Sequence, residues 1–211
     1  VNPCCTFSHM PSKIREVAQA KASQSNKSTP KGTLAMGFSP VLSAVQLIES
    51  IASIIDSVIL ERDRVYKDTT EIPKKTEFHA KFLPPISICD YLKRFYMLTK
   101  CDPHTFVIAL IYLDRIEEAK HEYVLDNFNA LRLLFLSLLA SLKFNQDFYY
   151  TNTYYAKVGG LSIEECNKLE KSYLVNLIKF DLVVNEETYN SYYFDVMAYH
   201  AAGEAENIEP Q

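Results

Sequence analysis

Two segments of the chain are apolar almost all the way round a helix, and they constrain the fold more than any other feature. Residues 104–119 read HTFVIALIYLDRIEEA, and residues 130–144 read ALRLLFLSLLASLKF. A helix that is hydrophobic on every side must be surrounded by other elements or by lipid. The longest such run, residues 133–142, is about half of the roughly 20 residues that a membrane span requires. We therefore expect two central helices of a globular core.

The segments around this pair have the apolar spacing of helices with one buried face. Apolar residues recur every three or four positions over residues 41–59 and 86–98, and this period is typical of amphipathic helices. Residues 162–180 give a long amphipathic helix, and residues 186–200 give a final aromatic one. No stretch alternates with the period of two that marks a strand. The fold class is therefore all-α, with about five helices in the body and one on each side.

The composition divides the chain into four parts. Residues 1–38 are rich in Ser, Lys, Gln, Asn, Thr and Pro, and we expect them to be disordered because they offer too few large apolar groups. Residues 39–66 form an N-terminal helix that Ser39 and Pro40 are expected to start. The main body with its C-terminal helix spans residues 75–200, and residues 201–211 form a tail.

Charge and cysteine usage exclude several classes of function. The net charge is −4 and the 22 Lys and Arg residues are scattered, so neither nucleic acid nor a membrane is an expected partner. Five cysteines without CxxC pairing suggest a reduced, intracellular protein of the cytoplasm or nucleus: Cys4, Cys5, Cys89, Cys101 and Cys166. The five scattered histidines suggest no metal or catalytic pair. We therefore expect a protein that is not an enzyme and holds no cofactor.

Gly159 and Gly160 lie side by side after the tyrosine-rich segment TNTYYAKV. A phosphate-binding loop needs a preceding strand and a spacing such as GxGxxG, and neither is present. A joint between two helices explains the pair better, because glycine adopts the left-handed conformation without steric cost. Ser162 would then cap the next helix, with Glu165 completing an S-x-x-E capping box.

Three blocks now resemble a known family: PISICDYLKRFYMLTKCDPHTFVIALIYLDRI, LLASLKFNQDFYYTN and YYAKVGGLSIEECNKLE. They look like the cyclin box of the single-box, phosphate-signalling cyclins of the P or U type, and the match runs from Phe78 to Val184. The resemblance implies a five-helix box with one further helix on each side. It also implies a regulatory subunit that binds and activates a cyclin-dependent kinase, in cell-cycle or phosphate signalling. Kinase substrates or inhibitors are further partners, and ATP and Mg²⁺ belong to the kinase.

The resemblance also assigns roles to single residues. Lys143 and Glu170 match a lysine and a glutamate that bind beside the kinase's activating helix. Asp147 matches an acidic position facing the kinase's activation segment, where it would pair with arginines. Asp114 matches a buried structural aspartate. One residue more than the family pattern separates Glu170 from Phe180, so either a helix bulge absorbs it or another residue replaces Glu170.

Two alternatives stay open at this point. Lys143 lies at the end of an apolar helix, where a solvated cation is favoured by the helix dipole alone. The chain could also be a kinase-independent adaptor or a transcription-related scaffold with the cyclin fold. Moreover, Pro85 stands where the mitotic cyclins carry a buried arginine, so the salt-bridge network of those cyclins cannot be carried over.

Overall fold

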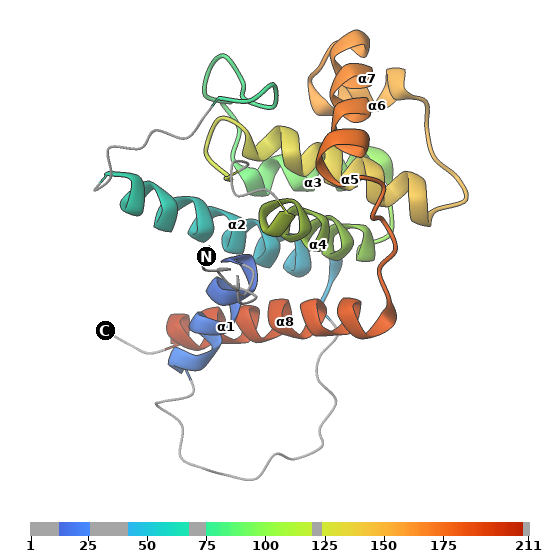
Figure 1. Cartoon of the computed structure of the whole chain (residues 1–211). Coiled ribbons are helices and arrows are strands. Elements are labelled where there is room, and N and C mark those ends of the chain that lie inside the picture. Colours follow the sequence, from blue (N-terminus) through green and yellow to red (C-terminus); the bar gives the residue numbers. More distant parts are fainter. Residues whose placement is uncertain (1–12, 26–41, 68–74, 120–123, 209–211) are drawn as a thin grey trace, which may run out of the picture.

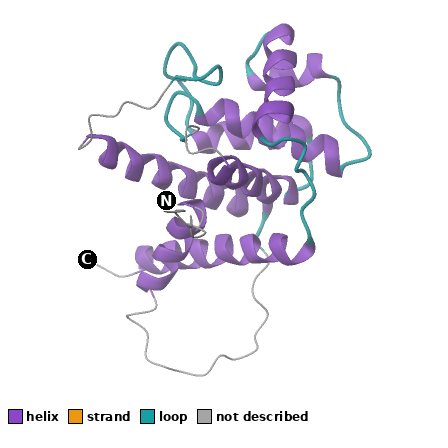
Figure 2. Ribbon diagram, viewed as in Figure 1, coloured by secondary structure: helices purple, strands orange, loops and turns teal. Residues whose placement is uncertain are grey.

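The computed structural model describes residues 13–25, 42–67, 75–119 and 124–208. Within these ranges every regular element is a helix (Figure 2), which confirms the all-α fold class. The helices are α1 (Lys13–Ser25), α2 (Ala44–Lys67), α3 (Ile88–Thr99), α4 (His104–Ala119), α5 (Ala130–Asn145), α6 (Asn152–Gly159), α7 (Ile163–Ser172), the π-helical turn η1 (Tyr173–Leu177) and α8 (Glu186–Ile208). Helices α3 to α7, with η1 continuing α7, are the five helices expected for the body.

Helices α4 and α5 lie together in the middle of the molecule, with α2 and α3 beside them, α6 and α7 on one side and α8 on the other (Figure 1). All residues of α4 from Thr105 to Asp114 are buried, as are all residues of α5 from Leu133 to Leu142. Phe95 of α3 contacts Phe106 and Phe135 edge-on, with ring centroids 6.3 Å apart in each case. The two segments that are apolar all round are thus the centre of the core. No helix in the described ranges is long and apolar enough to cross a membrane.

Helix α2 begins later than the sequence suggested. Ser43 is its N-cap: the Gln46 N–H donates to the Ser43 hydroxyl at 3.3 Å, and the Gln46 side-chain oxygen accepts from the Ser43 N–H at 3.0 Å. This reciprocal capping box satisfies two backbone donors at the helix start, and it makes Ala44 the first helical residue. The expected start at Ser39 and Pro40 lies outside the described residues.

The prediction of disorder over residues 1–38 is wrong for residues 13–25, which form α1. This helix crosses α8 at the base of the molecule (Figure 1), and among residues 13–23 it buries Ile14 and Ala18. Val17 packs against the core as well, Lys13 pairs with Glu61 of α2, and Arg15 and Gln19 contact Asp195 of α8. The local composition does not reveal these contacts. The tail expected from residue 201 onward is also wrong in part, because α8 continues to Ile208.

The glycine pair joins α6 to α7, as predicted. Gly160 has a left-handed φ of +71°, and the Leu161 N–H donates to the Ala156 carbonyl at 2.8 Å, which is the hydrogen bond of a Schellman motif. Gly159 is required for a different reason: a Cβ there would lie 2.8 Å from the Phe135 ring. Helix α6 can therefore pack directly on α5 only because residue 159 has no side chain.

Candidate functional site

Lys143 and Glu170, 27 residues apart in sequence, form an ion pair in the structure. Lys143 lies in the last turn of α5 and Glu170 near the end of α7, and the Lys143 Nζ lies 2.5 Å from Glu170 Oε1. The lysine side chain is 24% exposed and the glutamate 15%. The simple solvated cation considered for Lys143 is therefore not what the structure shows, because the amine is directed at a specific, half-buried carboxylate.

Asn152, the first residue of α6, lies between the two charges. Its Oδ1 accepts from Lys143 Nζ at 2.5 Å, and its Nδ2 donates to Glu170 Oε2 at 2.7 Å. The same Nδ2 donates to Asn167 Oδ1 at 2.7 Å. The Lys143–Glu170 pair is therefore one part of a polar network that joins α5, α6 and α7. Sequence reasoning did not identify Asn152.

The thiol of Cys166 lies one turn before Glu170 on α7 and is fully buried. Burial raises the pKa of this thiol to about 11, with the Glu170 carboxylate adding to the rise and the Lys143 ammonium opposing it. The thiol is therefore neutral at physiological pH, and the charges of the network are those of Lys143 and Glu170. Cys166 is therefore a packing residue of the core.

Two further contacts hold α7 and η1 against α5. The Arg132 guanidinium donates to Glu165 at 2.5 Å, and the hydroxyls of Ser137 and Tyr173 are hydrogen-bonded at 2.8 Å in the core. Ser162 caps α7 as predicted, because its hydroxyl accepts from the Glu165 N–H at 3.1 Å. The return half of the capping box is absent among the described hydrogen bonds, since Glu165 uses its carboxylate for Arg132 instead.

The extra residue between Glu170 and Phe180 coincides with a bulge in the helix. Residues Tyr173–Leu177 form a π-helical turn, in which the Ile178 N–H donates to the Tyr173 carbonyl at 3.0 Å. A π turn has hydrogen bonds from residue i to residue i+5 and so accommodates one more residue than an α turn. Of the two explanations left open, the bulge is the one that the structure contains, and Glu170 keeps its place opposite Lys143.

Several large apolar side chains are exposed on the segments that carry the pair. Phe144 follows Lys143 and is 51% exposed, and Phe180 follows the π turn and is 63% exposed. Lys179 and Phe180 have φ values of 50° and 59°, a left-handed conformation that costs a non-glycine residue about 1–2 kcal/mol. Aromatic residues are enriched at protein–protein interfaces, so these two side chains are candidates for contacting a partner. Sequence reasoning did not predict that either side chain is exposed, because both lie in segments whose other large apolar residues are mostly buried.

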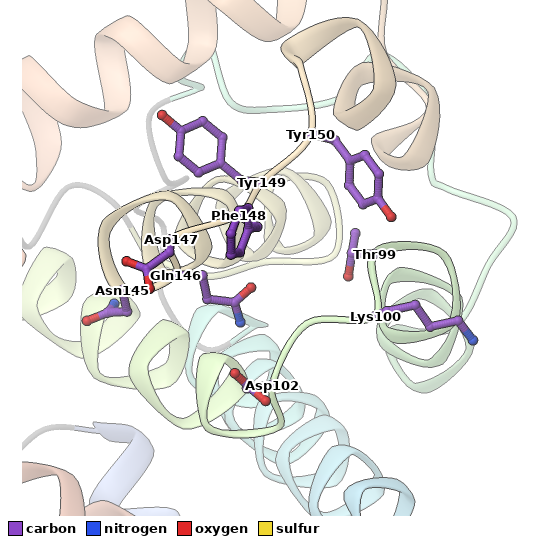
Figure 3. A pocket seen from close by; sticks show the side chains of 9 residues that line it. All are labelled: Thr99, Lys100, Asp102, Asn145, Gln146, Asp147, Phe148, Tyr149 and Tyr150. Carbon is purple, nitrogen blue, oxygen red and sulfur yellow. The ribbon is translucent and has the colours of Figure 1, made fainter.

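Asp147 lies on the loop between α5 and α6, at the edge of a cavity of about 550 Å³ (Figure 3). Its side chain is exposed, and none of the described hydrogen bonds or ion pairs involves it. Phe148, the next residue, is 91% exposed. Lys143 lies only four residues before Asp147, so the sequence places both at the same end of α5. The structure does not bring Asp147 into the polar network.

Asp114 of α4 is buried, with 1% of its surface exposed. A carboxylate buried to this extent fits the structural role that the resemblance implies and not a role in contacting a partner. In the described ranges no group of three or more His, Cys, Asp or Glu side chains could hold a metal ion.

The comparisons with known proteins agree with this geometry. The family model described as Cyclin matches residues 7–182. The chain belongs to the cyclin family. It is 37% identical to Cyclin-U4-1 of Arabidopsis thaliana over 148 residues, which is 70% of this chain and 73% of the relative. It is also 42% identical to Cyclin-P4-1 of Oryza sativa subsp. japonica over 115 residues, which is 54% of each protein.

These relatives make the chain a cyclin of the P/U type. A relative matched over more of the chain, Cyclin-U2-2 of Arabidopsis thaliana, is 30% identical over 186 residues, or 86% of this chain and 74% of the relative. Family membership supports a regulatory role and not a catalytic one. It does not identify the residues that contact a partner.

Proposed function

We propose that this cyclin binds and activates a cyclin-dependent kinase through a docking face made of the end of α5, the loop at residues 146–151 and the segment from Glu170 to Phe180. The observation that carries the proposal is the 2.5 Å Lys143–Glu170 pair, on segments that also expose Phe144 and Phe180. Aromatic residues are enriched at protein–protein interfaces, and the half-buried ion pair adds polar contacts to the surface that they provide.

The proposed mechanism is a population shift in the kinase. A kinase that alternates between two positions of its activating helix is driven toward the active one by a partner that binds that state more tightly. Lys143 and Glu170 would supply polar contacts to the helix, while Phe144 and Phe180 cover apolar surface beside it. ATP and Mg²⁺ are bound by the kinase, and this chain takes part in no chemical step.

Asp147 has a separate role in the proposal. Its exposed carboxylate would accept charge-assisted hydrogen bonds from arginines of the kinase activation segment. Such bonds order that segment in the way that a phosphate group does. This cyclin would then activate its kinase without phosphorylation of the segment. The proposed pathway is cell-cycle or phosphate signalling, with kinase substrates or inhibitors as further partners; the resemblance to the phosphate-signalling cyclins supports it.

The test uses Lys143→Glu in the full chain, purified from its native cell with whatever kinase accompanies it. Reversing the charge beside Glu170 removes the ion pair, and we expect the amount of co-purified histone kinase activity to fall at least about tenfold. Lys168→Glu is the matched control, since Lys168 is an exposed lysine on α7. An equal yield of kinase from Lys143→Glu and the control would remove α5 and α7 from the docking face. Wild-type chain that brings down no kinase would instead favour an adaptor.

A further inference from the structure

The Lys143–Glu170 pair is assembled within the isolated chain, and one neutral side chain makes this possible. Lys143 donates to Asn152 Oδ1 and to Glu170 Oε1, both at 2.5 Å. Glu170 accepts from Lys143 on one oxygen and from Asn152 Nδ2 on the other. Each member of this triangle therefore contacts the other two. No partner protein is required to complete it.

The chemistry of residue 152 is narrowly constrained by its neighbours. It must accept a hydrogen bond from an ammonium group on one side and donate to a carboxylate on the other. A primary amide has both functions on one planar group. An aspartate would accept from Lys143 but face Glu170 with a second negative charge, and alanine would leave both charges short of a partner.

Asn152 also lies where two parts of the docking face meet. It begins α6 directly after the loop that carries Asp147. The far end of this loop is fixed by Gln146, whose backbone N–H donates to the Leu142 carbonyl at 3.0 Å and whose side chain donates to Thr105 Oγ1 at 3.2 Å. Near the other end, the Tyr150 N–H donates to the Tyr155 hydroxyl at 3.0 Å. The exposed residues 147–149 are therefore held between two fixed points.

We propose that Asn152 is a positioning residue that preassembles the Lys143–Glu170 pair and aligns it with the Asp147 loop before a kinase binds. The proposal rests on the docking function proposed above. Asn152 itself acts through Lys143 and Glu170. Preorganisation of this kind raises affinity because the side chains do not have to be ordered during binding.

The first experiment concerns the free chain. NMR detection of the Lys143 ammonium protons reports whether they are held in hydrogen bonds and protected from exchange with water. We expect the signal in the wild type and its loss in Asn152→Ala, which removes one of the two acceptors of the ammonium group. The double variant Asn152→Asp/Glu170→Gln exchanges the amide and the carboxylate, keeps the net charge and should keep the signal. Protection that persists in Asn152→Ala, or its loss in the double variant, would overturn the proposal.

The second experiment measures binding to the kinase that co-purifies with the wild-type chain. We expect affinity to fall about three- to tenfold for Asn152→Ala and more for Asn152→Asp, which adds repulsion to the lost hydrogen bonds. Asn190→Asp, at an exposed position of α8, is the matched control and should bind as the wild type does. Thermal unfolding of each variant checks that it is folded.

The two proposals fail in different ways. If Lys143→Glu abolishes kinase binding but Asn152→Ala and Asn152→Asp leave it unchanged, the docking face stands and the role of Asn152 is overturned. If Lys143→Glu leaves kinase binding intact, the docking function is overturned and the role of Asn152 in it falls as well, whatever the ammonium signal shows.

Discussion

Helices α4 and α5 and helices α1 and α8 are both packed pairs, but different forces hold them. In the first pair, an unbroken run of residues is buried on each helix, and the contacts are almost entirely apolar. In the second pair, Ile14 and Ala18 are the buried residues among residues 13–23 of α1. Arg15 makes an ion pair with Asp195 at 2.8 Å, a hydrogen bond to Ser191 and a cation–π contact with Tyr192. The first pair therefore forms the centre of the core, and the second adds α1 to its outside.

The docking face proposed above combines apolar and polar contacts at the end of α5. Lys143 belongs to α5, whose preceding residues are fully buried, yet its amine reaches out to polar partners on α6 and α7. The apolar core therefore fixes where the backbone of the docking face lies, and the polar network fixes where its charges point. Substitutions that affect one without the other can separate the two contributions.

The largest loss of stability is expected for a substitution between α4 and α5. Leu139 of α5 has no exposed surface, and Leu139→Ala should lower the free energy of unfolding by about 2–5 kcal/mol because it removes buried methyl groups and leaves a cavity. Urea denaturation followed by circular dichroism measures this change. Leu60→Ala, at a leucine of α2 that is 54% exposed, should change it by less than about 0.5 kcal/mol. Similar losses from the two variants would contradict the central place of α5.

An intermediate effect is expected at the glycine pair, where the core meets α6. Gly159→Ala places a Cβ against the Phe135 ring, and we expect a loss of about 1–3 kcal/mol from overpacking. Gly160→Ala meets no atom within 4 Å but requires a left-handed alanine, at a cost of about 1–2 kcal/mol. Thermal unfolding measures both losses.

Phe135→Leu separates the two causes. It makes room beside residue 159, so the loss in Gly159→Ala/Phe135→Leu should be smaller than the sum of the two single losses. The same background should leave the cost of Gly160→Ala unchanged, because that cost is conformational. Strict additivity at residue 159 would show that Phe135 is not the neighbour that requires a glycine there.

The sequence predicts the apolar packing of α4 and α5 well and the packing of α1 on α8 poorly. A segment such as residues 130–144 reveals its burial directly, because every side of the helix is apolar. Helix α1 was missed because its stability comes from contacts with α8, about 170 or more residues away in sequence, while its own composition resembles a disordered segment. Tertiary contacts of this kind override local propensity.

The candidate site also contains residues that the sequence predicted and a residue that it did not. Lys143 and Glu170 were found through motifs that resemble a family, and their 2.5 Å contact follows from a fold that the sequence also predicted. Asn152 was missed because an asparagine after a tyrosine-rich loop suggests only a turn or a cap. Its role depends on the distance between two charges on other helices. The π turn was foreseen as one of two options, and only the backbone hydrogen bonds decided between them.

The smallest loss of stability is expected for a substitution between α1 and α8. The Arg15 and Asp195 side chains are 32% and 18% exposed, so their ion pair is screened by solvent and Arg15→Ala should cost about 0.5–1 kcal/mol. The loss should appear in α1 alone, as amide hydrogen exchange in α1 that is about two- to fivefold faster, because this helix opens locally while α4 and α5 stay folded.

Glu16→Ala is the matched control for Arg15→Ala, because Glu16 is exposed on the same helix and should leave exchange in α1 almost unchanged. High salt should speed exchange in α1 of the wild type and narrow its difference from Arg15→Ala, since salt screens the charges that Arg15 contributes. Amides of α5 should respond to neither change. If α1 and α5 instead exchanged at equal rates in every variant, α1 would open only with the whole molecule, and the two pairs would form one cooperative unit rather than a core with an added helix.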